Sequence, residues 1–305
     1  MRSGPDRASP LRIATRSSRL AMAQARLVGD ALPVAAELVC ISTRGDRARG
    51  TLSEIGGKGL FTAELEAALR RGEVQLAVHS AKDLPAEISE ETIIAAVPSR
   101  EDARDAVVSA DGAPLADLPR DARVGTSSLR RAAQALAIRP DLKVCPLRGN
   151  VETRLRKLRE GECEAVILAM AGLNRLGLSG QLAGRVWPLP VEQFVPAAGQ
   201  GALAVQCLAA DRATREVLSA INDAQAAAAL SAEREVVRRL GATCRSAVGV
   251  HIWPEGSDWR GVAIAADAGG ERIVRADARS ATARQAANDL HARLADAGAA
   301  DVLAR

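Results

Sequence analysis

Residues 12–25 read RIATRSSRLAMAQA, and residues 123–135 read RVGTSSLRRAAQA. Each stretch passes from a short apolar strand, through a turn rich in hydroxyl groups, into a segment with helical spacing that carries arginine. Two copies of one motif indicate two similar lobes. The alternative is chance similarity between short segments of biased composition, and the residues by themselves leave it open.

The surrounding sequence predicts an α/β fold with mainly parallel strands, because short apolar runs alternate with amphipathic stretches over the first two-thirds of the chain. Strands are expected at residues 11–15, 36–42, 74–79, 91–97, 105–109, 141–147, 164–169 and 201–207. Helices are expected at residues 18–32, 61–71, 127–138 and 151–160. If the halves are duplicated, we expect both helix N-termini at a crevice between the lobes, where they favour anions.

The alternation of short apolar runs with amphipathic stretches ends after Asp211. An alanine-rich helix is expected at residues 224–240, followed by apolar runs near 247–253, 259–265 and 272–276 and a last helix from about Thr282. This order predicts a smaller α+β domain with a three-stranded antiparallel sheet. The glycine-rich segment SEIGGKG, residues 53–59, is expected to be a mobile loop.

The amino-acid composition limits the number of domains and the classes of ligand that are expected. A chain of 305 residues with 48% hydrophobic content suits two or three domains. Aromatic residues make up 2%, which argues against a surface that stacks nucleic-acid bases. Almost all cations are arginines, whose planar donors suit carboxylate or phosphate, although a GC-rich genome would also favour arginine.

The five cysteines favour a reducing compartment over a disulfide framework or a zinc site, because they are scattered, odd in number and lack CxxC spacing. The three histidines show no ligand spacing, so no metal site is expected. The first ten residues lack an apolar core, and no apolar run approaches the roughly 18 residues of a membrane helix. We therefore expect a cytoplasmic protein.

The segment HSAKDLP, residues 79–85, follows an apolar strand, where parallel-sheet enzymes place functional groups. Lys82 beside Asp83 would keep that carboxylate ionised and ready to meet a cation or a transferable proton. The alternative is that these residues form a polar turn, closed by Pro85, that has no catalytic role.

The segments VGTSSLRR, residues 124–131, and PLRGNVETR, residues 146–154, together predict an anion site. They combine a glycine turn, hydroxyl groups, helix starts and four arginines, which is more positive charge than one carboxylate requires. The phosphate-loop pattern GxxxxGK[ST] is absent. Each segment taken alone could be a capped helix with solvated arginines.

Cys244 lies in RRLGATCRSAVG, residues 238–249, just after a predicted helix whose last turn is basic. Arg245 beside it could lower the pKa of the thiol, which would make the cysteine a nucleophile or an attachment point. A small buried hydrophobic residue is the alternative.

In this order the segments resemble the hydroxymethylbilane synthase family, also called porphobilinogen deaminase. The resemblance runs from about Leu11 to the end of the chain. It rests on RIATRSS (12–18), STRGD (42–46), IGGKGLF (55–61), HSAKDLP, VGTSSLRR, RGNVETR (148–154), ILAMAGLNRLGL (167–178), GQGAL (199–203) and the late cysteine.

The resemblance implies three domains, the first two like type II periplasmic-binding-protein lobes. They are residues 1–98 with 199–215, carrying the catalytic aspartate; 99–198, the lobe that binds anions and cofactor; and 216–305, carrying the cofactor cysteine. It also implies a monomeric cytoplasmic transferase of haem and other tetrapyrrole biosynthesis, with no metal, nucleic-acid or membrane partner. Such enzymes join four porphobilinogens head to tail with release of ammonia, then free linear hydroxymethylbilane by hydrolysis.

Site roles follow from the same resemblance. Cys244 would hold a dipyrromethane cofactor through a thioether, and Asp83 would stabilise the cationic azafulvene left when ammonia departs and manage pyrrole protons. Further cofactor contacts are implied for Lys82, Asp83, Thr126, Ser127, Ser128, Arg130 and Arg131. Substrate contacts are implied for Arg16, Ser18, Ser80, Arg148, Arg154, Arg175 and Gln200. Lys58 and Phe61 would belong to a lid.

Four features depart from the family pattern. Arg19 stands where proline is common, Ala81 replaces a larger apolar residue, and Glu54 stands where lysine is frequent. The loop after Cys244 reads RSAVG, without the usual proline.

Two alternatives to the enzyme remain: a non-catalytic protein of the same architecture that binds small anions, and a degenerate relative that keeps the cofactor without turnover. The enzyme requires residues 83 and 244 to face each other across an electropositive pocket.

Overall fold

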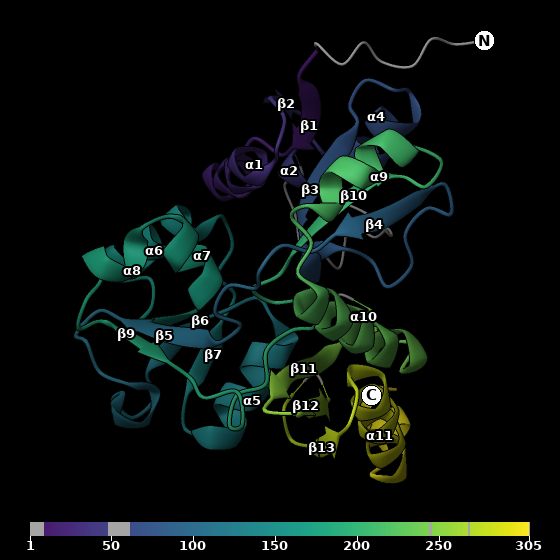
Figure 1. Ribbon diagram of the computed structural model, residues 1–305. Helices are drawn as coiled ribbons and strands as arrows, with labels where there is room; N and C mark the ends of the chain where they lie inside the picture. The colour runs from purple at the N-terminus through teal and green to yellow at the C-terminus, as the bar shows by residue number, and fades with distance from the viewer. Residues whose placement is uncertain (1–8, 48–61, 244–245, 268, 305) are drawn as a thin grey trace. The chain divides into compact units, whose positions relative to one another are not determined.

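The computed structural model describes residues 9–47, 62–243, 246–267 and 269–304 (Figure 1). The chain divides into two compact units, Met1–Ser99 with Ala202–Ala227 and Arg100–Gly201 with Ala228–Arg305. Cys244, Lys58, Phe61 and the predicted loop at 53–59 lie outside the described residues.

The first unit is built on a five-stranded sheet in the order β2-β1-β3-β10-β4. Its strands are β1 (Leu11–Thr15), β2 (Ala36–Cys40), β3 (Leu76–Ser80), β4 (Thr92–Ala96) and β10 (Leu203–Leu208). Its helices are α1 (Arg19–Ala31), α2 (Arg44–Arg47), α4 (Ala63–Arg70), the 3₁₀ turn η1 (Ala81–Asp83) and α9 (Arg212–Ser219). The strand β10 is antiparallel to both its neighbours, so four of the five strands point the same way.

Helices cover both faces of this sheet because successive side chains point to opposite sides of a strand. Ile13 packs with Val28 of α1 and Leu218 of α9 in one apolar cluster. Its neighbour Ala14 packs with Leu65 of α4 in another. These two-sided strands read as continuous apolar runs, as buried parallel strands do.

The second unit contains a sheet of the same design, in the order β7-β6-β8-β5-β9. Its strands are β5 (Asp105–Ser109), β6 (Arg123–Gly125), β7 (Lys143–Cys145), β8 (Ala165–Ala169) and β9 (Val186–Pro188). Its helices are η2 (Leu115–Asp117), α5 (Leu129–Ile138), α6 (Val151–Arg159), α7 (Met170–Arg175) and α8 (Leu178–Gln181). The strand β5 is antiparallel to β8 and β9, as β10 is to its neighbours in the first sheet. The repeated motifs occupy equivalent places, β1–α1 and β6–α5.

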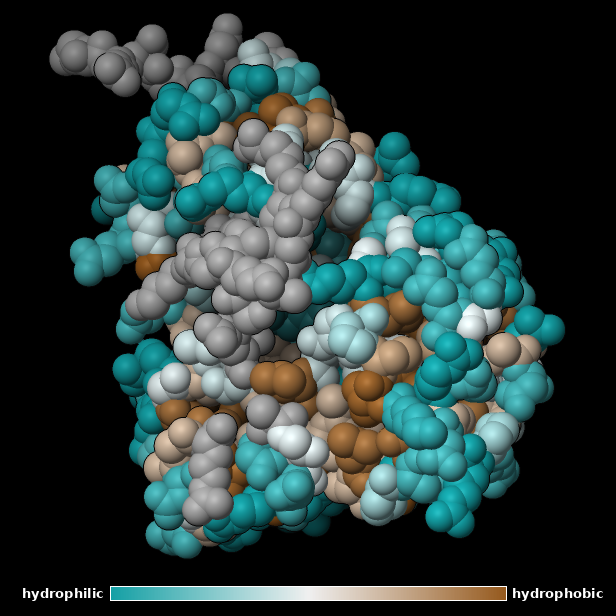
Figure 2. Space-filling model, turned by 180° about the vertical axis from the view of Figure 1, so that it is seen from behind, coloured by the Kyte–Doolittle hydropathy of each residue, from teal (hydrophilic) through white to brown (hydrophobic). Residues whose placement is uncertain are grey.

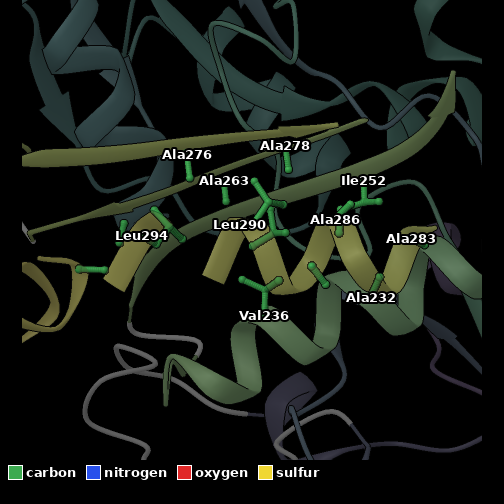
Figure 3. Close-up of a cluster of buried hydrophobic side chains, with 14 residues drawn as sticks. Ala232, Val236, Ile252, Ala263, Ala276, Ala278, Ala283, Ala286, Leu290 and Leu294 are labelled. Carbon is green, nitrogen blue, oxygen red and sulfur yellow. The ribbon is translucent and has the colours of Figure 1, made fainter. Parts of the chain in front are cut away.

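The C-terminal part of the second unit holds a three-stranded antiparallel sheet, β11 (Ala247–Glu255), β12 (Asp258–Ala266) and β13 (Ile273–Ser280). Its helices are α10 (Ala224–Arg239), of which residues 228–239 belong to this unit, α11 (Ala283–Asp296) and α12 (Ala299–Leu303). Figure 3 shows α11 between this sheet and α10, with Leu290 toward the sheet and Val236 of α10 facing α11. Most side chains of this core are alanines, and their small size lets helix and sheet approach closely. The core is therefore well packed although the chain has few aromatic side chains.

The expected fold class is therefore confirmed, with two mainly parallel sheets and a separate three-stranded antiparallel one. The strand predicted at 141–147 is shorter than expected, because Pro146 has no N–H to continue a ladder. The short elements α7, α8, β9 and α9 were not predicted. The proposed boundaries of three domains remain a prediction.

Within the described residues, no helix has the length and apolar character needed to cross a bilayer. Figure 2 shows one face on which hydrophilic side chains predominate and hydrophobic ones form small groups.

Candidate functional site

Asp83 lies exposed on a turn that is anchored at both ends. It is the last residue of η1, which directly follows β3. Ala81 and Leu84 on either side are buried, the Ala81 N–H donates to the Ala202 carbonyl at 3.0 Å, and the Leu84 N–H donates to the Ala81 carbonyl. Lys82 is exposed like Asp83. The turn thus presents a carboxylate and an ammonium to solvent from a rigid edge of the sheet.

Arg16, Ser18 and Ser80 lie near the same edge. Strands β1 and β3 are parallel neighbours, so the residues after each strand emerge on the same side. Ser18 caps α1, its side chain accepting from the Ala21 N–H at 3.2 Å. The Ser80 hydroxyl is hydrogen-bonded to the amide of Gln24 at 2.8 Å and 3.1 Å, which ties α1 to the end of β3. The structure therefore brings these predicted residues together with Lys82 and Asp83.

His79 is a buried structural residue beneath this edge. Its Nε2 lies 3.0 Å from Gln206 Oε1, and the Gln206 amide nitrogen donates to Glu66 at 2.8 Å and Thr92 at 2.6 Å. Burial lowers the pKa of His79 to about 4, with Gln206 opposing and the charge of Arg16 adding to the shift. A neutral imidazole that donates to Gln206 satisfies this arrangement.

In the second unit, the turn between β6 and α5 holds the predicted hydroxyl groups. The Thr126 N–H donates to the Cys145 carbonyl at 3.0 Å, and Ser127 Oγ donates to the Leu147 carbonyl at 3.0 Å. Ser128 caps α5, its side chain accepting from the Arg131 N–H. The N-terminus of α5 therefore points out of the sheet edge with hydroxyl groups around it, an arrangement that suits an anion.

Arg130 and Arg131 share one buried carboxylate. Arg130 Nη1 and Arg131 Nη2 each lie 2.7 Å from Asp105, whose side chain has no exposed surface. Arg130 also donates to the Val195 carbonyl, and Arg131 to the Ile167 carbonyl. Burial lowers the pKa of Arg130 while Asp105 opposes that shift. Two guanidinium groups and one carboxylate leave an excess positive charge at the start of α5.

Arg148 lies just before the neighbouring helix α6, and Arg154 lies in its first turn. Asn150 caps α6 by accepting from the Thr153 N–H at 2.8 Å, and Arg154 Nε donates to the Gly149 carbonyl at 2.9 Å. Because β6 and β7 are parallel in register, α5 and α6 begin at the same edge of the sheet. Both arginines are half-buried there.

Arg175 and Gln200 complete the predicted set in this unit. Arg175 Nη2 donates to the Gly201 carbonyl at 2.7 Å, and burial lowers the pKa of this guanidinium to about 10, with Glu101 opposing. The Gln200 amide donates to the Ala103 carbonyl at 2.8 Å and to Asp105 at 3.0 Å. Gln200 thus helps orient the carboxylate that holds Arg130.

Sequence reasoning missed the two residues that position these groups, Asp105 and Gln24. Asp105 is the first residue of a correctly predicted apolar strand, and a carboxylate entering such a strand signals a cationic partner. No comparable signal singled out Gln24.

The donor set fits a ligand with several carboxylates, because helix N-termini, hydroxyl groups and arginines surround one edge of the second sheet. Among the residues that the structure describes, no group of three or more His, Cys, Asp or Glu could hold a metal ion.

Comparison with known proteins identifies the family. Residues 11–216 match the family described as porphobilinogen deaminase, dipyromethane cofactor binding domain. The porphobilinogen deaminase of Sorangium cellulosum is 45% identical over 276 residues, which cover 88% of this chain and 91% of that protein. That of Roseiflexus castenholzii is 47% identical over 254 residues, covering 81% and 83%. That of Bordetella parapertussis is 45% identical over 305 residues, covering 96% of each. The chain belongs to the porphobilinogen deaminase family.

Proposed function

We propose that this chain is a transferase that joins four porphobilinogens head to tail on a covalently bound dipyrromethane, releases ammonia at each step and hydrolyses the product to linear hydroxymethylbilane. This reaction belongs to porphyrin and haem biosynthesis. The observation that carries the proposal is the buried excess of positive charge at Arg130, Arg131 and Asp105, within the segment that matches the cofactor-binding family.

The arginines account for the substrate class. Each porphobilinogen brings an acetate and a propionate, so a growing chain accumulates negative charge. Arg148, Arg154 and Arg175 would bind these arms of substrate and product, together with Arg16 and Ser18. A planar guanidinium binds a carboxylate through two parallel hydrogen bonds, which fixes the position of the arm as well as neutralising its charge.

Thr126, Ser127 and Ser128 would hold the cofactor with Arg130 and Arg131. When bound, the dipyrromethane supplies the pyrrole carbon to which the first substrate is joined. Asp105 keeps both guanidinium groups in place, so their remaining donors are already oriented and little side-chain entropy is lost on binding.

Asp83 would stabilise the positive charge of the reaction intermediate and transfer protons at the pyrrole nitrogens. Loss of ammonia from the aminomethyl group of porphobilinogen leaves a cationic pyrrole, which a nearby carboxylate stabilises. The same carboxylate can accept a hydrogen bond from a pyrrole N–H and take up or return a proton. The anchored η1 turn supports this role because it limits the movement of Asp83, and Lys82 would add a cation for a carboxylate arm.

Intact mass spectrometry tests the proposal. Protein purified from cells that make porphobilinogen should carry the added mass of two pyrrole units, and tryptic peptides should place it on Cys244. The Cys244→Ser variant should lack the added mass. A protein of unmodified mass would instead support a non-catalytic protein that binds small anions, whereas added mass without turnover would indicate a degenerate relative.

We also propose that the protein is a cytoplasmic monomer with three domains, residues 1–98 with 199–215, 99–198 and 216–305. Light scattering after gel filtration should give the mass of one chain, and limited proteolysis should cut first near the proposed boundaries. A dimer mass would reject the monomer.

A further inference from the structure

The backbone carbonyl of Val195 is an acceptor that two side chains of α5 share. Val195 lies in the segment that follows β9 and is completely buried. Its carbonyl oxygen accepts from Arg130 Nη1 at 2.6 Å and from Gln134 Nε2 at 3.0 Å. The same Nη1 of Arg130 donates to Asp105 at 2.7 Å. The position of Arg130 therefore depends on one carboxylate and on one backbone carbonyl.

Gln134 holds both polar groups of the Val195 backbone. Its Oε1 accepts from the Val195 N–H at 2.6 Å, while its Nε2 donates to the Val195 carbonyl. Gln134 lies one turn after Arg130 on α5 and is only 4% exposed. A side-chain amide offers both the acceptor and the donor that this pattern requires, whereas a carboxylate has no N–H to donate. Gln134 thus fixes Val195 to the helix that carries Arg130.

The strand β11 packs against the same carbonyl. A Cβ built on Gly249 would lie 2.8 Å from the Val195 oxygen, so the missing side chain of this glycine leaves the space that the oxygen occupies. The next residue, Val250, donates its N–H to the Pro196 carbonyl at 3.0 Å. Residues 195–196 therefore contact both α5 and β11, and they set the position of this strand relative to the helix.

We infer that Gln134 is a positioning residue of the proposed cofactor site, acting on Arg130 through the Val195 carbonyl. The inference rests on the proposed function, in which Arg130 binds the dipyrromethane. A buried guanidinium has lost its hydrogen bonds to water, so its N–H groups need acceptors that stay in place. With Nη1 held by Asp105 and Val195, the remaining donors of Arg130 keep one orientation, and less side-chain entropy is lost when a carboxylate binds.

Amide exchange tests the contact between Gln134 and Val195. The Val195 N–H of the purified protein should exchange slowly with deuterium, because it is buried and bonded to Gln134. Gln134→Met keeps a similar volume but removes both hydrogen bonds. Exchange at Val195 should become about tenfold faster, as expected for the loss of one buried hydrogen bond.

Gly261→Ala in β12 is the control for a general loss of stability. The added Cβ would lie 2.8 Å from Leu290 Cδ1, so the substitution disturbs the same sheet through a contact that does not involve Val195. It should leave exchange at Val195 unchanged, even where urea unfolding shows that the variant is less stable.

Cofactor occupancy tests the positioning role. By intact mass, the fraction of Gln134→Met that carries two pyrrole units should lie several-fold below that of the wild type, whereas Gly261→Ala should be fully loaded. In the loaded molecules of Gln134→Met, kcat should fall several-fold while KM for porphobilinogen changes little, because Arg130 is assigned to the cofactor and not to the incoming substrate. A purely structural role would reduce the amount of folded protein and leave both constants unchanged per loaded molecule.

Gln134→Glu separates the two contacts and also tests the inference if Gln134→Met does not fold. Glutamate keeps an oxygen for the Val195 N–H but has no donor for the Val195 carbonyl, so exchange should stay slow while occupancy falls. Unchanged exchange in Gln134→Met would overturn the contact, and wild-type occupancy and kcat in both variants would overturn the positioning role. A wild-type protein without the added mass that still shows the difference in exchange would reject only the proposed function.

Discussion

Arg100 and Glu233 form a two-point ion pair, with Nη1 to Oε1 at 2.7 Å and Nη2 to Oε2 at 3.0 Å. Glu233 also accepts from the Gly199 N–H at 2.6 Å and the Ile252 N–H at 2.8 Å, and His251 Nδ1 lies 3.1 Å away. Arg100 Nε donates to the Gln200 carbonyl. One buried carboxylate on α10 therefore joins three other segments of the second unit.

Removing this carboxylate should destabilise the protein strongly. The Glu233→Ala variant leaves the largely buried Arg100 guanidinium without its carboxylate and two backbone N–H groups without an acceptor, which should cost roughly 3–5 kcal/mol in the free energy of unfolding. Urea unfolding followed by circular dichroism measures it. The matched control is Glu235→Ala on the same helix, whose ion pair with Arg238 is exposed and should contribute little. Equal losses in the two variants would contradict the prediction.

The same pair should make stability depend on acid pH. Burial by itself would raise the pKa of Glu233, but Arg100 and then His251 hold it at about 2, below its ordinary 4.5. Below about pH 4.5 this carboxylate therefore binds a proton in the unfolded chain, whereas in the folded chain it binds one only near pH 2. The contribution, roughly 3 kcal/mol, is present above pH 4.5 and fades as the pH falls toward 2. Glu233→Gln should lack this contribution, so its unfolding curve should vary less over that range.

His79 should remain neutral far below its ordinary range. Its folded-state pKa is about 4 against 6.5, so the unfolded state binds more protons between these values and stability falls as pH drops from 6.5 to 4. NMR titration of the imidazole protons should show a midpoint near pH 4. A midpoint near 6.5 would show that the imidazole is not buried against Gln206 as described.

Gly201 should not tolerate a side chain. Its φ is +86°, and a Cβ there would lie 2.3 Å from the Glu101 carbonyl oxygen. Gly201→Ala should cost roughly 3 kcal/mol or more, because the backbone must move as well as adopt a strained conformation. Gly161→Ala is the control, since its φ is +77° but nothing lies within 4 Å. Urea unfolding of both variants should separate the steric clash from the backbone strain alone.

Asp83 should matter for turnover more than for stability, because its side chain is exposed. Asp83→Ala should lower the rate of porphobilinogen consumption by about 10²- to 10⁴-fold, the usual contribution of a proton-transferring group. Asp83→Glu should impair the reaction while intact mass still shows the cofactor, since the carboxylate survives in a shifted position. Glu90→Ala, an exposed acidic residue in the following loop, should turn over normally. Near-normal turnover of Asp83→Ala would refute the assigned role.

The alternation of most strands and longer helices and the residue types of the candidate site could be predicted from sequence, because both depend on local patterns. The apolar run before His79 defines β3, and the hydroxyl groups at 126–128 mark the start of α5. The partner of each charge could not be predicted in this way. Asp105 lies 25 residues from Arg130, and Arg100 lies 133 residues from Glu233.

The amino-acid sequence by itself predicted two similar lobes, a polar turn at Lys82 and Asp83 and an arginine-rich anion site in the second lobe, because hydrophobic period, glycine and capping residues act over a few positions. Only the tertiary structure decided that Arg130 and Arg131 share Asp105 and that Arg100 pairs with Glu233. Burial makes such contacts specific, because a charge removed from water costs free energy unless a partner lies beside it. The register of the sheet decides which partner lies near, however distant it is along the chain.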